Sequence, residues 1–125
     1  MAAEDAPVVW EGDSRAVLRE FPEDVREDLG LDLWRVQNGL PPLDSGSMAP
    51  ALPGVFELRD RDKDCWYRVL YIRIGNVIYV LHSFRKKTNE TPQRDIRTAE
   101  QRLKNVRQRL AVTEREKKYG DRKHE

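Results

Sequence analysis

The hydrophobic pattern changes to a period of two at Gly54, and this change constrains the fold more than any other feature of the sequence. Apolar and polar residues alternate in the first of three segments, and aromatic and β-branched residues dominate the other two. The segments are residues 55–59, 66–72 and 77–81. A charged run at residues 60–64 separates the first two, and Gly75-Asn76 gives a tight hairpin turn between the last two. We therefore predict an antiparallel meander of three strands.

Upstream of the meander, the sequence indicates one short strand and two helices. Residues 7–11 alternate weakly and form the strand, and Asp13 or Ser14 is placed to cap a first helix that ends near Phe21. A second helix begins at Pro22, a residue that suits the first turn, and carries an apolar stripe at spacings of four, four and three. The stripe consists of Val25, Leu29, Leu33 and Val36. We expect it to face the sheet.

A proline-rich loop and a long helix flank the meander. Four prolines fall within residues 41–53, so this segment is predicted to form a loop. After the last strand, Thr91-Pro92 marks a helix start, and an apolar seam follows at spacings of three, four, three and four. The seam consists of Ile96, Ala99, Leu103, Val106 and Leu110. It covers only two heptads, so we interpret it as packing within the chain rather than as a coiled-coil dimer.

The order of elements predicts an α+β fold in a single domain, residues 1–110. We expect an antiparallel sheet of about four strands, an N-terminal helical hairpin and a C-terminal helix. Residues 113–125 are almost wholly polar, so we expect a tail at residues 111–125 that is frayed or disordered. In a chain of 125 residues, a second independent core would leave both cores marginal.

Composition argues against several kinds of site. Apolar residues make up 38% of the chain and charged residues 36%, so the core must be thin, with little room for a buried small molecule. Cys65 is the only cysteine, and neither it nor His82 or His124 has zinc-ligand spacing. Residues 1–5 lack the features of a signal peptide, and 18 apolar residues never run together. We expect a cytoplasmic protein that uses no metal or cofactor and does not enter the membrane.

The net charge of +1 conceals a strong asymmetry along the chain. Residues 1–84 carry a net charge of −6, and residues 85–125 carry a net charge of +7. A polyanion, an acidic segment of a partner protein, or the acidic half of the chain itself could neutralise such a basic segment.

Four segments, in their order and spacing, resemble the RelE/ParE toxin superfamily, and in detail its HigB-like, phage-derived branch. The resemblance covers roughly residues 8–110, and Thr91-Pro92 follows the last segment. The segments are Phe21-Pro22-Glu23-Asp24-Val25-Arg26, Pro53-Gly54-Val55-Phe56-Glu57-Leu58-Arg59, Tyr67-Arg68-Val69-Leu70-Tyr71 and His82-Ser83-Phe84-Arg85-Lys86-Lys87-Thr88. The resemblance implies a RelE-like fold.

The resemblance also implies a function, the toxin of a type II toxin–antitoxin system. Members of this branch cut messenger RNA at the ribosomal A site as endoribonucleases without a metal. An antitoxin, often a helix-turn-helix protein, neutralises them, and operator DNA is a further partner through the antitoxin. One alternative is a non-enzymatic inhibitor of DNA gyrase, because ParE members use the same scaffold. The other is a degenerate member that only binds its antitoxin and operator DNA.

Cleavage of RNA through the neighbouring 2′-hydroxyl needs a base, an acid, and cations that stabilise the phosphorane. Glu57 and Arg59 share one face of their predicted strand, and Arg68 lies on the next strand. Lys86 and Lys87 follow the last strand, and the resemblance implies a basic pair there. We expect these residues to grip a scissile phosphate. The candidates for contact with RNA are Arg85, Lys86, Lys87 and Arg94.

The candidates for proton transfer are His82, Glu57 and Lys87. Glu57 departs from the basic residue of the RelE pattern and fits the HigB-like branch. RelE itself uses a tyrosine in its final segment, and that position falls near Pro92 or Gln93 here. The acid and the base therefore stay unassigned among the three candidates.

Each candidate also has a structural interpretation. His82 could point into the packed face of the sheet, and Glu57 with Arg59 could form a cross-strand ion pair. The basic pair Lys86-Lys87 could be a solvated turn. Arg68 interrupts an apolar strand, so it must lie at a groove or be paired, because burying a lone charge costs several kcal/mol.

Aromatic residues of the predicted strands could stack on bases, but a thin domain needs most of them to fill its core. These residues are Trp66, Tyr67, Tyr71 and Tyr79. Trp34 and Leu40, near the end of the second helix, are candidates for contact with an antitoxin.

Overall fold

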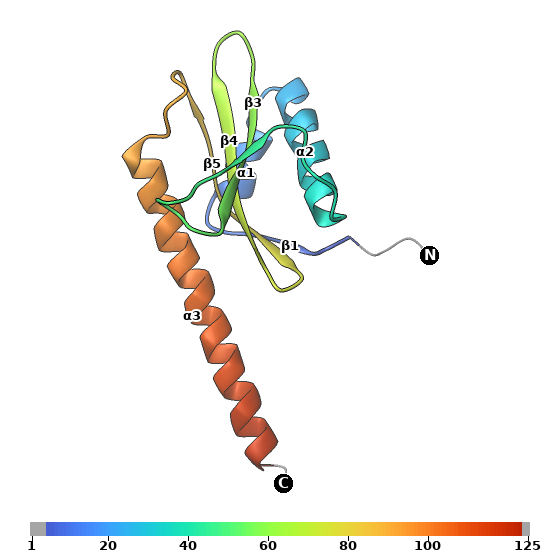
Figure 1. Ribbon diagram of the computed structural model, residues 1–125, viewed down its shortest axis with the longest axis vertical. Coiled ribbons are helices and arrows are strands. Elements are labelled where there is room, and N and C mark those ends of the chain that lie inside the picture. The colour runs from blue at the N-terminus through green and yellow to red at the C-terminus, as the bar shows by residue number, and fades with distance from the viewer. Residues whose placement is uncertain (1–4, 124–125) are drawn as a thin grey trace.

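The computed structural model describes residues 5–123 and has an α+β architecture (Figure 1). The strands are β1 (Val8–Trp10), β2 (Ser45–Ser47), β3 (Val55–Arg61), β4 (Trp66–Ile74) and β5 (Val77–Lys86). The helices are α1 (Ser14–Arg19), α2 (Glu23–Gln37) and α3 (Gln93–Lys123). Predictions that concern residues 1–4, His124 and Glu125 lie outside the described residues. Among the described helices, none combines the length and the apolar composition that a membrane span requires.

The sheet is mixed and has five strands, in the order β1-β5-β4-β3-β2. The predicted meander is confirmed, since β3, β4 and β5 pair antiparallel. The prediction of about four antiparallel strands was wrong at both edges. β1 pairs with β5 in parallel, and β2 forms within the predicted proline-rich loop and pairs antiparallel with β3. The residues of β2 are Ser-Gly-Ser, which have little strand propensity, so pairing with the edge of β3 and not local preference creates this strand.

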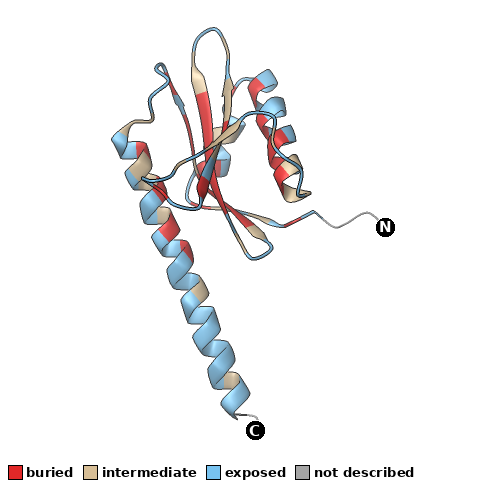
Figure 2. Ribbon diagram, in the orientation of Figure 1, coloured by how far each residue is buried: buried red, intermediate tan, exposed pale blue. Residues whose placement is uncertain are grey.

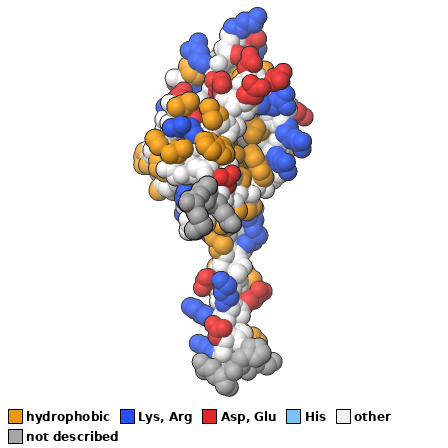
Figure 3. All heavy atoms as spheres, turned by 90° about the vertical axis from the view of Figure 1, so that its right-hand side faces the viewer, with side chains coloured by type: hydrophobic (Ala, Val, Ile, Leu, Met, Phe, Trp, Pro, Cys, Tyr) orange, Lys and Arg blue, Asp and Glu red, His pale blue; other side chains and the backbone are white. Residues whose placement is uncertain are grey.

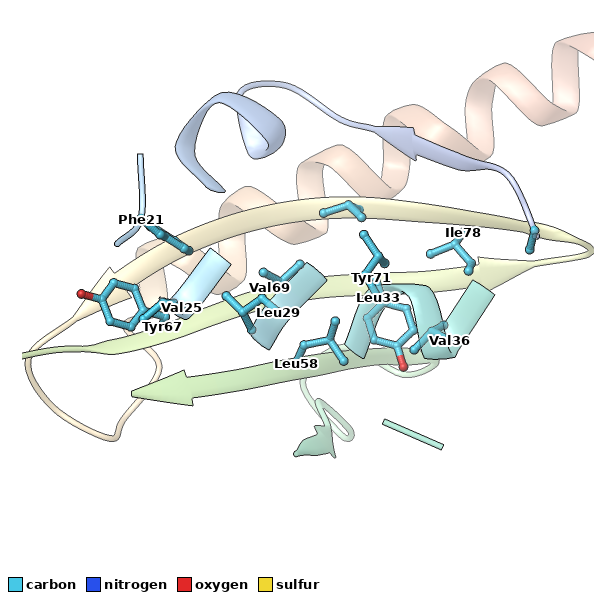
Figure 4. Close-up of a cluster of buried hydrophobic side chains, with 12 residues drawn as sticks. Phe21, Val25, Leu29, Leu33, Val36, Leu58, Tyr67, Val69, Tyr71 and Ile78 are labelled. Carbon is cyan, nitrogen blue, oxygen red and sulfur yellow. The ribbon is translucent and has the colours of Figure 1, made fainter. Parts of the chain in front are cut away.

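One face of the sheet is covered by α2, whose apolar stripe packs on β3, β4 and β5 as the sequence predicted (Figure 4). Pro22 stands immediately before α2, and Asn38 follows its last residue. The helical hairpin predicted at the N-terminus is not confirmed. α1 contacts chiefly β5, whereas α2 contacts chiefly β3. The two helices therefore pack mainly on different strands rather than on each other.

The opposite face of the sheet is covered by the first half of α3 (Figure 2). The predicted seam meets a second apolar cluster that includes Leu70, Leu81 and Phe84. α3 then continues to Lys123, beyond the last apolar residue of the seam at Leu110. Glutamate, lysine and arginine dominate this part and have good helix propensity. The division into a domain at residues 1–110 and a frayed tail stays a prediction.

Candidate functional site

Two neighbouring strands bring three of the predicted site residues together on the α3 face of the sheet. Arg59 of β3 lies directly opposite Arg68 of β4 in the strand register. Glu57 shares this face because it precedes Arg59 by two residues. In the next row toward the end of the sheet, Arg61 lies opposite Trp66.

The carboxylate of Glu57 lies between two guanidinium groups. Its Oε2 is 3.3 Å from Nε of Arg68, and its Oε1 is 3.6 Å from Nη1 of Arg59. Arg59 also contacts Oδ1 of Asp44 at 2.9 Å and donates a hydrogen bond to the carbonyl of Ser45. The side chain of Arg68 is only 3% exposed. Burial lowers the pKa of Arg68, and the positive charge of Arg59 lowers it further, while Glu57 opposes both effects.

A short loop between β5 and α3 closes over Arg68 and Lys86. Nη2 of Arg68 donates to Oδ1 of Asn89 at 2.7 Å, and Nζ of Lys86 donates to the carbonyl of Asn89 at 3.1 Å. Lys86 also donates to Oγ1 of Thr91 at 3.2 Å. β5 is longer than predicted and ends at Lys86, so this lysine is buried and does not lie in a turn beyond the strand. Burial, together with the positive charge of Arg68, lowers the pKa of Lys86.

Beside these cations lies a cavity of about 200 Å³. It is lined by Asp44, Arg59, Asp60, Arg61, Trp66, Arg68 and Asn89. The guanidinium carbons of Arg61 and Arg68 lie 4.4 Å and 5.3 Å from the centre of the Trp66 ring, within cation–π range. Three guanidinium groups and one indole therefore meet at a cavity large enough for a phosphate group.

His82 lies outside this cluster and links β5 to α3. Its Nε2 is 2.7 Å from Oδ1 of Asp95, and its Nδ1 is 3.3 Å from Nη1 of Arg102. Because an arginine only donates, Nδ1 of His82 must accept, and Nε2 then carries the proton that is donated to Asp95. The imidazole also stacks on Phe84, with ring centres 5.0 Å apart. Both nitrogens are thus occupied by partners within the chain.

The other residues that were predicted to contact RNA point outward from the domain. Arg85 and Lys87 are exposed and line a shallow depression of about 490 Å³ with Asp64, Cys65 and Lys86. The side chain of Arg94, near the start of α3, is 83% exposed. Of the aromatic residues, Tyr67, Tyr71 and Tyr79 are buried in the two apolar clusters, and only Trp66 reaches the cavity.

Four residues that line the cavity were missed by the sequence analysis: Asp44, Asp60, Arg61 and Asn89. Arg61 had a detectable signal, since it follows Arg59 by two residues and so shares its face. Asn89 had none, because its role depends on how the loop folds back over Arg68. Asp60 was assigned only to a charged turn, although it belongs to β3 and borders the cavity.

Asp60, at the rim of the site, is an unusually weak acid for an aspartate. Its Oδ1 accepts a hydrogen bond from the backbone of Arg61 at 2.8 Å, whereas its Oδ2 is buried without a hydrogen-bond partner. Burial raises the pKa of Asp60 to about 6, and the neighbouring carboxyl groups of Asp28 and Asp44 add to the effect. These groups also line a second cavity of about 260 Å³ between α2 and β3.

The substitution Asp60→Asn tests this environment through the pH dependence of stability. A carboxyl group whose pKa is raised in the folded state stabilises the fold below pH 3.8, and this contribution is lost as the pH rises toward about 6. Asparagine cannot ionise, so the variant should gain roughly 1 kcal/mol over the parent between pH 4 and pH 7, a value reduced for the partial exposure of Asp60. Urea titrations of both proteins at the two pH values measure the difference. An equal change in both proteins would contradict the assignment.

Among residues 5–123, no group of three or more histidine, cysteine, aspartate or glutamate side chains is placed to hold a metal ion. No curated protein matches the sequence. The sequence does match the family of phage-derived Gp49-like proteins (DUF891) over residues 16–104, which is more than two thirds of the chain and includes all the strands from β2 to β5. The chain therefore belongs to the phage-derived Gp49-like family, which lies within the RelE/ParE-like toxin–antitoxin context.

Proposed function

We propose that this protein is the toxin of a type II toxin–antitoxin pair, of the HigB-like branch, and that it inhibits translation by cutting messenger RNA on the ribosome. The Gp49-like family is associated with toxin activity of the ribonuclease type, which supports the proposal. The observation that carries it is the cavity in which Arg59, Arg61 and Arg68 meet Trp66. Guanidinium groups fork onto phosphate oxygens, and an indole stacks on a base.

In this proposal, the scissile phosphate takes the place of Asn89 at the guanidinium of Arg68. The loop that carries Asn89 moves aside, so that Arg68 and Lys86 exchange their contacts with the loop for contacts with phosphate oxygens. The 2′-oxygen attacks phosphorus as its proton passes to a water molecule, and the bond from phosphorus to the 5′-oxygen breaks. Arg59 and Arg68 stabilise the charge that develops on the phosphorane, with Glu57 keeping the two guanidinium groups aligned.

For proton transfer, elimination leaves Lys87 among the three candidates, and it lines the neighbouring depression rather than the cavity itself. The carboxylate of Glu57 is engaged by two arginines, and both nitrogens of His82 are occupied by partners within the chain. Lys87 has an exposed ammonium group next to buried Lys86. We therefore assign to Lys87 the donation of a proton to the departing 5′-oxygen.

The substitution Lys87→Ala should slow cleavage roughly tenfold. This is less than a shielded general acid contributes, because water can partly replace an exposed ammonium group. Single-turnover cleavage of a defined messenger RNA in a reconstituted translation reaction measures the effect. Lys63→Ala removes an exposed lysine from the turn between β3 and β4 and is the matched control. Equal rates for the two variants would remove Lys87 from the mechanism.

The decisive experiment maps the 5′ ends of transcripts after brief induction of the chain alone. We expect growth arrest, with new 5′ ends inside translated codons. Arrest without new 5′ ends would refute the ribonuclease, and trapped gyrase–DNA complexes would then indicate the ParE-like alternative. No arrest at any expression level would indicate a degenerate member that only binds its antitoxin.

An antitoxin is the partner that this function requires, and we propose that it covers the apolar surface near α2. Figure 3 shows apolar side chains gathered on this side of the molecule. Leu31, Trp34, Leu40 and Leu43 are among the large apolar residues that are exposed. A short helix-turn-helix protein encoded beside this gene should relieve growth arrest when both are expressed. It would also bring the complex to operator DNA.

A further inference from the structure

The outward face of α3 carries a basic stripe along the whole helix. Positions at spacings of three and four face away from the apolar seam. They are Arg94, Arg97, Gln101, Lys104, Gln108, Val112, Arg115, Tyr119 and Arg122, which we call the α3 stripe. Every one of these residues is exposed, five are arginine or lysine, and none is acidic. At 1.5 Å per residue, the α3 stripe is about 42 Å long.

Two other arginines of α3 have ion-pair partners elsewhere in the chain, whereas four of the five basic residues of the α3 stripe have none among the described residues. Arg102 contacts Oδ1 of Asp13 at 2.7 Å, and Arg109 contacts Oε1 of Glu11 at 2.8 Å, so these two arginines tie the helix to the acidic N-terminal part of the chain. In the α3 stripe, Arg94 approaches Asp95 at 4.0 Å. The other four basic residues form no ion pair with any described residue; they are Arg97, Lys104, Arg115 and Arg122.

The second half of the α3 stripe lies on a part of the helix that projects from the domain. Figures 1 and 2 show this part extending away from the sheet, with most of its surface exposed. Past Leu110, none of the residues whose side chains the structure describes belongs to either apolar cluster. A projecting charged helix contributes little to the hydrophobic core, so packing does not constrain its exposed residues. These residues can contact another molecule.

We propose that the α3 stripe binds the phosphate backbone of double-helical RNA. A row of cations without acids suits a regularly charged polyanion, and its glutamines can donate to phosphates and 2′-hydroxyls. A single strand is a poorer fit because such sites use several aromatic platforms, whereas this row contains one aromatic residue. The choice of RNA over DNA rests on the proposed function, in which the protein acts on ribosomes. The α3 stripe begins just after the loop that covers Arg68, so it extends from the candidate site.

The test measures binding of the full-length chain to a fluorescent RNA hairpin, with a DNA duplex of the same sequence and an unpaired RNA as comparisons. The stripe variant carries Arg97→Gln, Lys104→Gln and Arg115→Gln. A control with the same change in net charge carries Arg107→Gln, Lys117→Gln and Lys118→Gln, at exposed positions outside the α3 stripe. We expect the stripe variant to bind the hairpin at least tenfold more weakly, and the slope of log K against log salt to become shallower by about two to three. The control should stay within about twofold of the parent.

The proposal would be overturned by no hairpin binding by the parent, by equal losses in both variants, or by DNA bound as tightly as RNA. Preferential binding of the unpaired RNA would also overturn it. Growth arrest and transcript cleavage are measured separately with the same variants. If the parent binds the hairpin through the α3 stripe but never arrests growth, the proposed function fails and the binding surface stands. If the parent arrests growth but the hairpin result is negative, only the binding surface fails.

Discussion

Replacing Arg68 with alanine is expected to slow RNA cleavage roughly 100- to 1,000-fold and to abolish growth arrest. Arg68 is the most deeply buried cation of the site and lies directly between Glu57 and the loop residue Asn89. Its charge acts where water is largely excluded, and electrostatic stabilisation of a phosphorane is strongest there.

The same burial means that Arg68→Ala could act through folding. The substitution leaves Glu57 with Arg59 as its remaining ion-pair partner and leaves Oδ1 of Asn89 without its donor. Arg68→Lys keeps the positive charge but loses the planar guanidinium group that can bind two oxygens at once. It therefore separates the effect of the charge from the effect of the hydrogen-bonding geometry. We expect the lysine variant to be folded and still at least tenfold slower than the parent.

Cleavage is measured in a translation reaction at equal concentrations of folded protein, verified by circular dichroism. Arg73→Ala is the matched control because Arg73 is an exposed arginine at the opposite end of the same strand. A folded Arg68→Lys variant that cleaves as fast as the Arg73→Ala control would show that Arg68 does not act on the phosphate.

The central part of this fold was predictable because its signals are local. Alternation identifies β3, aromatic and β-branched residues identify β4, and the spacing of Leu29 and Leu33 identifies the buried face of α2. The edges of the sheet were not predictable in the same way. β2 has no propensity of its own, and the parallel pairing of β1 joins residues about 70 positions apart, such as Val8 and Ile78.

In the candidate site, the face of the sheet on which each side chain lies was predictable, but its hydrogen-bond and ion-pair partners were not. A spacing of two puts Glu57 and Arg59 on one face, and the meander places Arg68 beside them. Nothing in the sequence shows that Asn89 folds back onto Arg68 or that Asp95 pairs with His82. Both contacts depend on the path of the chain between β5 and α3, where composition permits many conformations.

Replacing Leu70 with alanine is expected to lower the free energy of unfolding by about 3 kcal/mol. Leu70 is fully buried at the centre of β4, beneath α3. Its removal leaves a cavity that the surrounding strands cannot easily fill, because β4 is hydrogen-bonded to β3 on one side and to β5 on the other. Leu43→Ala is the matched control, since Leu43 is 71% exposed and its truncation should change stability by less than about 0.5 kcal/mol. Urea titrations measure both values.

The Leu70→Ala variant also separates stability from chemistry at the site. Leu70 lies in one cross-strand row between Glu57 and His82, two residues from Arg68, but its side chain carries no charge and no proton. If the cations perform the reaction, the variant should cleave RNA within about threefold of the parent at a low temperature where both proteins are folded. It should then lose activity on warming in parallel with its unfolding. A folded Leu70→Ala protein as slow as Arg68→Ala would mean that packing beneath α3, rather than the charge of Arg68, limits the reaction.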